Sequence, residues 1–168
     1  VVARDEFNRV VASKEMDGWQ LTAMRGTPYG MARRIFLSEL GLPCTRPPWG
    51  KIAAVDLNSG KVLWNKPFGT IEDVAPAIVP NFEWGVPNLG GPMTTASGLI
   101  FVGASIDFYF RAYKTSTGEE IWKYRLPTSA NAIPMSYVFN GKQYIAIAVG
   151  GHGGLGTPKG DQLMVFAL

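Results

Sequence analysis

Two stretches of the chain are copies of one another: Ala54-Val-Asp-Leu-Asn-Ser-Gly-Lys-Val-Leu-Trp64 and Ala112-Tyr-Lys-Thr-Ser-Thr-Gly-Glu-Glu-Ile-Trp122. They share Ala, Gly and Trp at identical offsets. Units that repeat in this way cannot bury their own apolar faces and stack on neighbours of the same kind. The shared Gly suits a tight turn with positive φ, the shared Ala leaves room beneath it, and the Trp covers the neighbouring unit. The repeat therefore predicts stacked units in which Trp64 and Trp122 serve packing rather than ligand binding.

The composition favours many short strands. Of 168 residues, 46% are hydrophobic and 17% are charged, and 20 Gly and 12 Pro separate runs of aromatic and β-branched residues. We predict an all-β fold. The net charge of +3 forms no basic stripe, which argues against a nucleic-acid partner. No apolar run approaches the roughly 18 residues that cross a bilayer, so we expect any export signal or membrane anchor outside this chain.

Turn signals divide the chain into units. Residues 92–133 are expected to form a complete four-stranded antiparallel meander, with turns at Gly98 and Gly118. Residues 134–168 turn at Asn140-Gly141 and are expected to lack a fourth strand, which an N-terminal strand of the whole protein would supply. Residues 50–91 hold the last two strands of an earlier unit and a connection, and residues 1–49 an irregular segment and the start of that incomplete unit. Such meanders are typical of β-propeller blades, so we predict a piece of a larger propeller.

Weaker signals lie in residues 1–49. Cys44 has no second cysteine to pair with and no nearby histidine, so we interpret it as a packed small apolar residue. Helical spacing of apolar residues predicts two short helices, one through Phe7, Val10 and Val11 and one through Ala32, Ile35, Phe36 and Leu40.

The repeats resemble the tryptophan-docking motifs of pyrroloquinoline quinone (PQQ)-dependent dehydrogenases. Further strings resemble the C-terminal end of the membrane-bound glucose and quinate dehydrogenase group, and the resemblance covers residues 22–168. These strings are Gly26-Thr-Pro-Tyr-Gly, Leu42-Pro-Cys-Thr-Arg-Pro-Pro-Trp-Gly50, Pro87-Asn-Leu-Gly-Gly-Pro, Phe110-Arg-Ala-Tyr, Gly141-Lys-Gln-Tyr and Gly150-Gly-His-Gly-Gly-Leu-Gly-Thr157.

The resemblance implies an eight-bladed propeller on the periplasmic side of the inner membrane. It implies that PQQ lies near the axis with a bound Ca²⁺, that a sugar or cyclitol hydroxyl (glucose, quinate or shikimate) is oxidised, and that electrons pass to ubiquinone. In this family the C5 carbonyl of PQQ receives the hydride, Ca²⁺ acts as its Lewis acid, and an Asp takes the hydroxyl proton. That Asp and the main Ca²⁺ ligands are expected in earlier blades, so no catalytic or metal-binding residue is expected in this chain.

Two segments are candidates for cofactor binding. Asn88-Leu-Gly-Gly91 opens a blade where an innermost strand faces the axis, and its glycines let backbone N–H groups approach a planar polyanionic cofactor. We therefore expect Asn88, Leu89 and Gly90 to bind PQQ, although alcohol-oxidising relatives have an aromatic residue in place of Leu89. A strand-initiating turn with a capping Asn is the alternative. Asp107, between the second and third strands of that blade, is the other candidate, with a turn acid as the alternative.

His152 is the only histidine and lies in a glycine-dense loop after an apolar strand. Glycines on both sides argue against burial in a core, and the resemblance places this loop near the substrate entrance. We expect His152 to contact the substrate, and a structural role is the alternative. The loop also matches G-x-G-x-x-G from Gly151 to Gly156, but we expect no helix after it and interpret the match as coincidental.

Glu72-Asp73 offers adjacent carboxylates for Ca²⁺, but neighbours in a strand point to opposite faces, which argues against shared ligation.

For function, the alternative to an enzyme is a non-catalytic scaffold, since propellers with the same docking repeats serve as assembly proteins at the bacterial outer membrane without a quinone. The open glycine loops at Asn88 and His152 favour the enzyme.

Overall fold

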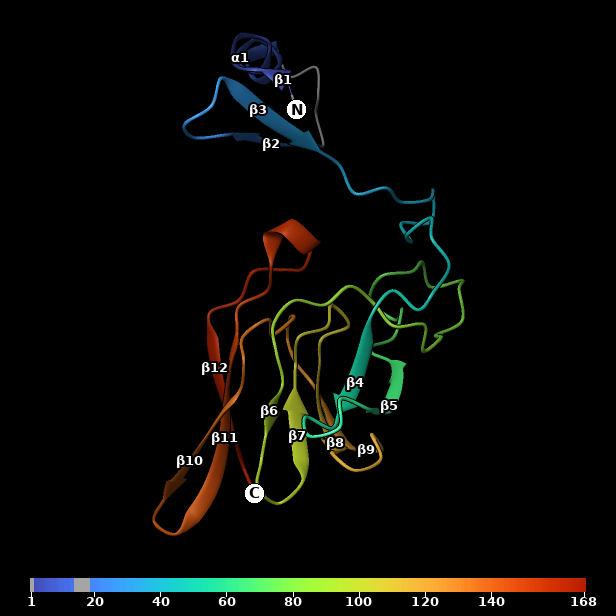
Figure 1. Cartoon of the computed structure of the whole chain (residues 1–168), viewed down its shortest axis with the longest axis vertical. Helices are drawn as coiled ribbons and strands as arrows, with labels where there is room; N and C mark the ends of the chain where they lie inside the picture. The colour runs from blue at the N-terminus through green and yellow to red at the C-terminus, as the bar shows by residue number, and fades with distance from the viewer. Residues whose placement is uncertain (1, 14–18) are drawn as a thin grey trace. The chain divides into compact units, whose positions relative to one another are not determined.

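A computed structural model describes residues 2–13 and 19–168 (Figure 1). The chain divides into two compact units, Val1–Ser38 and Glu39–Leu168. In the described part of the chain, the regular elements other than one helix and one 3₁₀ turn are antiparallel strands. The predicted all-β fold is therefore confirmed.

The first unit is a small sheet with a helix packed on it. Phe7, on the helix, is buried against Gly30, where any side chain would collide with its ring. The helix predicted through Phe7, Val10 and Val11 is therefore confirmed. The elements are β1 (Val2–Ala3), α1 (Arg4–Ser13), β2 (Gln20–Ala23) and β3 (Tyr29–Arg33), in the sheet order β1-β3-β2.

The helix predicted at residues 32–40 is wrong. Ala32 lies in β3 and pairs with Leu21 of β2, so its backbone hydrogen bonds run across strands. Residues 34–40 are irregular, and Ile35 and Phe36 are exposed, so the apolar spacing has no face to bury. Cys44 is exposed as well, which contradicts its interpretation as a packed residue.

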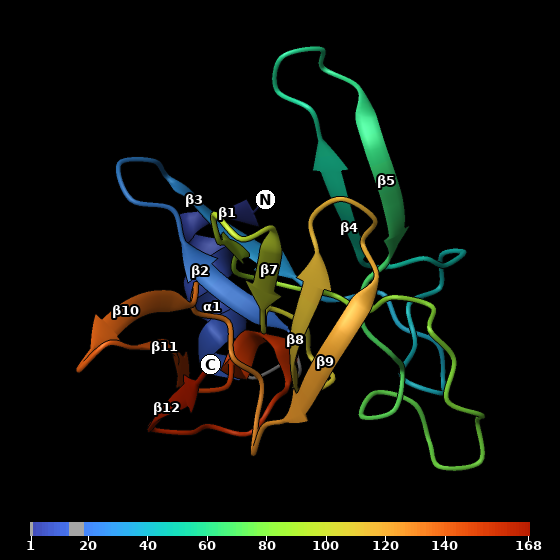
Figure 2. The ribbon, with the colours of Figure 1, turned by 90° about the horizontal axis from the view of Figure 1, so that it is seen from below.

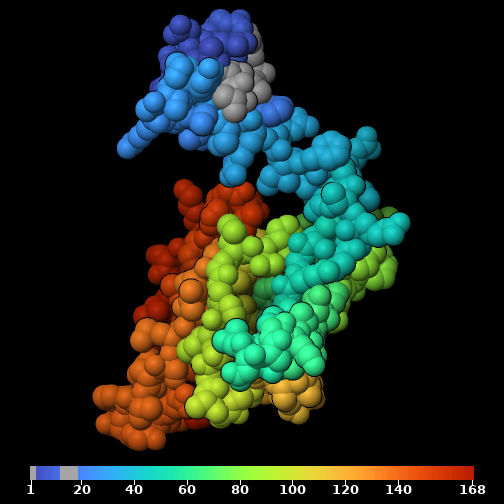
Figure 3. Space-filling model, in the orientation of Figure 1, coloured from blue at the N-terminus to red at the C-terminus, as the bar shows by residue number. Residues whose placement is uncertain are grey.

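The second unit holds three antiparallel sheets that lie side by side (Figures 1 and 2). The central sheet has four strands in chain order, β6-β7-β8-β9, as the meander pattern predicts. On the face of the second unit that Figure 3 shows, residues of β4 and β5 lie beside those of β6 and β7, and the last sheet lies on their other side. The strands are β4 (Lys51–Val55) and β5 (Val62–Pro67), then β6 (Met93–Thr94), β7 (Leu99–Val102), β8 (Tyr109–Lys114) and β9 (Glu120–Arg125), then β10 (Met135–Phe139), β11 (Lys142–Val149) and β12 (Gln162–Ala167).

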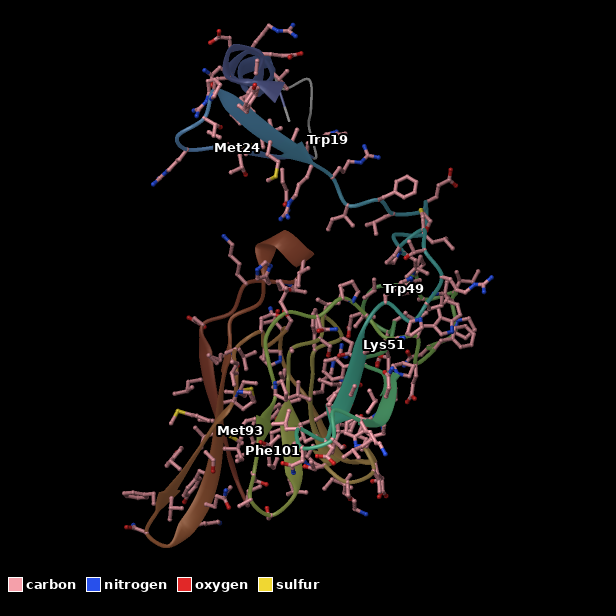
Figure 4. All side chains as sticks on the ribbon, in the orientation of Figure 1. Trp19, Met24, Trp49, Lys51, Met93 and Phe101 are labelled. Carbon is pink, nitrogen blue, oxygen red and sulfur yellow. The ribbon has the colours of Figure 1, made fainter. Side chains whose placement is uncertain are left out.

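The two middle strands of the central sheet, β7 and β8, are buried on both faces. Successive side chains of a strand point to opposite faces, so Phe101 and Phe110 pack against strands β11 and β12. Ile100, Val102 and Tyr113 face the other way and pack with Ile52 and Trp64 of the β4-β5 sheet. Met93 and Phe101, labelled in Figure 4, belong to the first of these two clusters. The β10-β11-β12 sheet thus covers one face of β7 and β8, and the β4-β5 sheet covers the other.

Trp64, at the end of the first repeat copy, connects the β4-β5 sheet to the central sheet. Its indole Nε1–H donates a hydrogen bond of 2.8 Å to the carbonyl oxygen of Thr115, in the turn between β8 and β9. Its ring lies on Gly118 of the same turn, where a Cβ atom would be 2.7 Å from the ring carbon Cδ2. Gly118 has a φ of +67°, which glycine adopts without strain. The predicted covering of a neighbouring unit by Trp64 is therefore confirmed.

Trp122 occupies the equivalent place on β9. Its ring centroid is 5.4 Å from that of Phe166 on β12 and 5.8 Å from that of Phe110 on β8. Trp122 therefore contacts the neighbouring sheet by edge-to-face ring packing, which is the packing role that the repeat predicts.

The contact between Trp64 and Gly118 can be tested by a pair of glycine substitutions in the whole protein. We expect Gly118→Ala to lower the free energy of unfolding by about 2–4 kcal/mol, because the new methyl group must displace the indole and strain the turn. Gly98→Ala is the matched control, since Gly98 has a φ of +81° in a turn of the same sheet and open space around it. The control should lose only the backbone term of about 1–2 kcal/mol in denaturant unfolding. Equal losses would contradict the docking role.

Candidate functional site

The connections between strands are tied to one another at the end of the second unit that lies uppermost in Figure 1. The N–H of Leu89 donates to the carbonyl of Ala104 at 2.9 Å, and the N–H of Gly151 donates to the carbonyl of Ser129 at 2.9 Å. Residues predicted as site residues from the sequence therefore lie in connections that are packed together, not in the hairpin turns at the opposite end.

The turn at Asn88 to Gly90 is fixed through its backbone. Asn88 forms an antiparallel bridge with Ser105, and its Nδ2 donates to the carbonyl of Val86 at 3.4 Å. Gly90 has a φ of +117°, and a Cβ atom there would lie 2.5 Å from the carbonyl oxygen of Asn131. The side chain of Leu89 is 46% exposed. The turn thus presents an apolar side chain on a rigid backbone just before β6.

A small pocket lies beside this turn. Its volume is about 70 Å³, and Lys51, Phe68, Asn88 and Gly90 are among the residues that line it. Lys51 begins strand β4 (Figure 4). Ligand pockets usually measure about 300–1,000 Å³, so this one is too small for a cofactor. A planar cofactor would have to lie on the exposed side of the turn, against Leu89, with its other walls supplied by further residues.

Asp107 is fully buried, and its carboxylate accepts hydrogen bonds from Ser105, Arg111 and Thr70. Its Oδ1 accepts hydrogen bonds from the Ser105 hydroxyl at 2.5 Å and from Arg111 Nη1 at 3.0 Å. Its Oδ2 accepts from the backbone N–H of Thr70 at 2.7 Å and forms an ion pair with Arg111 Nη2. Burial by itself would raise the pKa of this carboxyl, but the hydrogen bonds and charge of Arg111, with those of Ser105 and Thr70, hold the pKa below its ordinary value.

The Arg111 guanidinium links two carboxylates. Besides Asp107, its Nε lies 3.1 Å from Oε2 of Glu120 on β9, and the Tyr113 hydroxyl donates to the same oxygen at 3.2 Å. Burial raises the pKa of Tyr113, so this phenol stays protonated and acts as a donor. The cluster holds the Phe68 to Thr70 segment against β8 and β9. A role for Asp107 in cofactor binding stays a prediction, and in this structure its carboxylate is engaged with protein donors.

The loop that carries His152 is narrow at its base. The N–H of Gly160 donates to the carbonyl of Gly150 at 2.8 Å, and Gly151 has a φ of +67° and packs so closely on the Pro158 carbonyl that any side chain would collide. His152 itself is exposed, which agrees with the expectation drawn from its neighbouring glycines. A single 3₁₀ turn, η1 (Gly153–Leu155), follows it. A dinucleotide fingerprint requires a helix there, so its interpretation as a coincidence is confirmed.

Glu72 and Asp73 were expected in a strand, but the structure places both of them in a turn. Both reach Arg125: Asp73 forms an ion pair with Nη2, and Glu72 Oε2 lies 3.9 Å from Nη1. Hydrogen bonding to Asp73 raises the pKa of Arg125. Among residues 2–13 and 19–168, no three His, Cys, Asp or Glu side chains are grouped to hold a metal ion. Both carboxylates are thus engaged with Arg125 in this structure.

Sequence reasoning missed Arg111, Ser129 and Thr157, which hold the candidate residues in place. Arg111 lies four positions after Asp107, but only its burial, at 2% exposure, distinguishes it from a solvated arginine. Thr157 and Ser129 are joined by a hydrogen bond of 2.8 Å across a long stretch of chain. No spacing rule in the sequence predicts such a contact.

The three sheets, their repeated tryptophan turns and the linked connections define consecutive blades of a propeller. The family model described as "PQQ: Glucose/ethanol/alcohol dehydrogenase, beta-propeller domain" matches residues 2–145. The chain therefore belongs to the β-propeller domain family of PQQ-dependent dehydrogenases, as the resemblance predicts.

Relatives with similar sequences are named as quinoproteins. Quinoprotein glucose dehydrogenase A of Acinetobacter calcoaceticus is 48% identical over 147 residues, which cover 86% of this chain and 18% of the relative. Quinate/shikimate dehydrogenase (quinone) of Acinetobacter baylyi is 40% identical over 156 residues, covering 90% of this chain and 19% of the relative. This chain thus spans about a fifth of the length of these curated relatives.

Among solved structures, the quinohemoprotein alcohol dehydrogenase from Comamonas testosteroni is similar to this chain. The match has a TM-score of 0.48 and 28% sequence identity, and it covers 67% of this chain and 14% of that chain. No helix in the described part of the present chain is long and apolar enough to cross a membrane.

The cluster around Asp107 predicts a pH-dependent stability. Asp107→Asn would leave the buried guanidinium of Arg111 without its main partner, and we expect a loss of about 3–5 kcal/mol in unfolding free energy of the whole protein near pH 7. Because the folded pKa of Asp107 lies below the ordinary value of 3.8, its stabilisation is complete above that pH and is lost as the pH falls through the folded pKa.

Denaturant unfolding as a function of pH checks this. The stability of the wild-type protein should fall below pH 3.8 more steeply than that of Asp107→Asn. Asp161→Asn, at an exposed position, is the control and should follow the wild type. Parallel pH profiles for the wild type and Asp107→Asn would contradict the assignment.

Proposed function

We propose that this chain is part of a PQQ-dependent dehydrogenase that oxidises a hydroxyl group of a sugar or cyclitol. The membership of residues 2–145 in the PQQ propeller family carries this proposal. Relatives named for glucose and for quinate or shikimate support a polyhydroxylated substrate. Ubiquinone as acceptor, Ca²⁺ bound by residues elsewhere in the protein, and a periplasmic location at the inner membrane through an anchor in the remainder of the protein complete the proposal.

The turn at Leu89 would form one wall of the cofactor site. When bound, PQQ would accept two electrons from the substrate. An exposed leucine on a rigid backbone fits the apolar face of a planar ring system, and the bridge between Asn88 and Ser105 would keep it in place. The described residues fit one face of the cofactor only, because the pocket beside the turn is too small to hold it.

His152 would contact the substrate. It is exposed on a loop whose base is closed by glycine contacts, so its backbone is held while its imidazole remains accessible. An imidazole in this position would offer a hydrogen bond to a substrate hydroxyl and would fix the orientation of the sugar or cyclitol ring.

The remainder of the propeller would be the protein partner. An apolar groove of about 530 Å³ lies between the central sheet and β12, and Phe101, Phe110, Trp122 and Phe166 are among its lining residues. On the β10-β11-β12 sheet, Val138 is 68% exposed and Leu163 is 70% exposed. Such surfaces support further packing partners, because isolated propeller blades leave apolar faces uncovered.

The direct test is an assay of the whole protein reconstituted with PQQ and Ca²⁺. We expect substrate-dependent reduction of an artificial dye with glucose or quinate, and none without PQQ. A protein that binds no PQQ and reduces no dye with either substrate would contradict the proposal and favour a scaffold.

The cofactor role of the Leu89 turn has a separate test in PQQ binding by the apoprotein. Gly90→Ala would bring a methyl group to 2.5 Å from the carbonyl of Asn131 and displace the turn. We expect the Kd for PQQ to rise about tenfold, or about 1.4 kcal/mol. Gly98→Ala is the control, since Gly98 also has a positive φ, +81°, and lies in a hairpin turn of the same sheet with open space around it. Unchanged PQQ affinity in Gly90→Ala would remove this turn from the cofactor site.

A further inference from the structure

The segment between β9 and β10 touches both parts of the candidate site. The carbonyl of Asn131 lies against Gly90, in the turn at residues 88–90. The carbonyl of Ser129 accepts the N–H of Gly151, in the loop at residues 150–160 that carries His152. Ser129 is fully buried and Thr128 is 2% exposed, although both side chains are polar. Buried hydroxyl groups need hydrogen-bond partners, so the partners of these residues indicate what the segment holds.

A chain of hydrogen bonds leads from this segment to His152. Asn131 Nδ2 donates to Ser129 Oγ at 3.2 Å, and Ser129 Oγ lies 2.8 Å from Thr157 Oγ1. Thr157 Oγ1 also accepts the backbone N–H of His152 at 2.7 Å and lies 3.4 Å from the carbonyl of the same residue.

Each hydroxyl has one hydrogen to donate and can also accept. Ser129 Oγ accepts from Asn131 Nδ2, and either hydroxyl can be the donor in the 2.8 Å contact between Ser129 and Thr157. The N–H of His152 is bound to the Thr157 side chain, whereas the His152 carbonyl accepts the backbone N–H of Leu155 at 2.9 Å and lies 3.4 Å from Thr157 Oγ1. Thr157 is therefore the side chain that fixes the histidine's backbone.

We propose that Thr157, supported by Ser129 and Asn131, is a positioning residue. It holds His152 at a fixed position relative to the turn at residues 88–90. The inference rests on the proposed function, because the contact of His152 with substrate belongs to it. The loop needs such a residue, since the glycines that surround His152 restrict the backbone little. The Gly150–Gly160 hydrogen bond and the Thr128 hydroxyl on the Pro158 carbonyl at 2.6 Å lie at the base of the loop, and the Leu155 N–H binds the His152 carbonyl at 2.9 Å.

The first test compares two substitutions in the whole reconstituted enzyme. Thr157→Val keeps the shape of the side chain but removes the acceptor of the His152 N–H and the hydrogen bond with Ser129 Oγ. We expect KM for the accepted substrate to rise about tenfold with kcat within about twofold, because ground-state positioning is lost. Thr157→Ser restores the hydroxyl and should return KM to within about threefold of the wild type.

The matched control is Thr117→Val. The Thr117 Oγ1 accepts the N–H of Glu119 at 3.2 Å on an exposed turn, so this variant loses a comparable hydroxyl away from the candidate site. It should leave KM unchanged. An unchanged KM in Thr157→Val, or an equal rise in Thr117→Val, would overturn the positioning role.

A double variant tests whether Thr157 acts through the histidine. In a His152→Ala background, Thr157→Val should give no further rise in KM, since the side chain that it positions is gone. A further rise of about tenfold in that background would overturn the proposal. If Thr157→Val does not fold, Ser129→Ala takes its place, with an expected rise in KM of about threefold, and an unchanged KM there overturns the proposal equally.

A second readout needs no catalysis. Lys159 is exposed in the loop, so trypsin cleavage after it in PQQ-free protein reports loop opening. Cleavage should be at least about threefold faster in Thr157→Val than in the wild type and Thr157→Ser. A wild-type enzyme without activity would contradict the proposed function, whereas an active wild type with unchanged KM and cleavage in Thr157→Val would overturn the positioning role alone.

Discussion

The two middle strands of the central sheet, β7 and β8, bury side chains on both faces, so this sheet needs a neighbour on each side. Phe101 and Phe110 require the cover of β11 and β12, and Ile100 and Val102 require that of β4 and β5. Each large apolar side chain contributes about 1.5–3 kcal/mol when fully buried, which makes these interfaces the main source of stability. Trp64, seated on Gly118, fixes how one pair of sheets is aligned.

The same stacking brings the candidate site together. Because the sheets lie side by side, the connections that leave their ends meet, and polar groups fix them where they meet. Asp107 and Arg111 hold the segment at Thr70, while Ser129 and Thr157 hold the loop of His152. Buried polar groups of this kind are costly unless every partner is present, so they select one arrangement of the loops. The turn at Leu89 and the loop of His152 are thus each held in one arrangement, as the proposed site requires.

What the sequence predicts well is local or periodic. The strands from Lys51 onward follow from alternation and turn residues, and the docking of Trp64 follows from a repeat that contains its own turn glycine. Exposure of His152 follows from the glycines beside it. Each of these signals lies within a few residues of the feature that it predicts, and tertiary contacts do not override it.

What the sequence does not predict depends on distant contacts. The spacing of Ala32, Ile35 and Phe36 is helical, but cross-strand pairing with Leu21 takes Ala32 into a strand. Glu72 and Asp73 were expected to diverge in a strand, yet a turn directs both to Arg125. The hydrogen bond between Ser129 and Thr157 joins two connections, and the identity of neither residue indicates its partner.

The proposed PQQ-dependent site contains both the turn at Leu89 and the loop of His152. Amide hydrogen exchange of the whole protein, measured with and without PQQ, tests it most directly. We expect PQQ to slow exchange in residues 88–91, together with residues 128–131 and 150–157, through the contacts of Asn131 and Ser129. PQQ binding that leaves exchange in all three segments unchanged would contradict it.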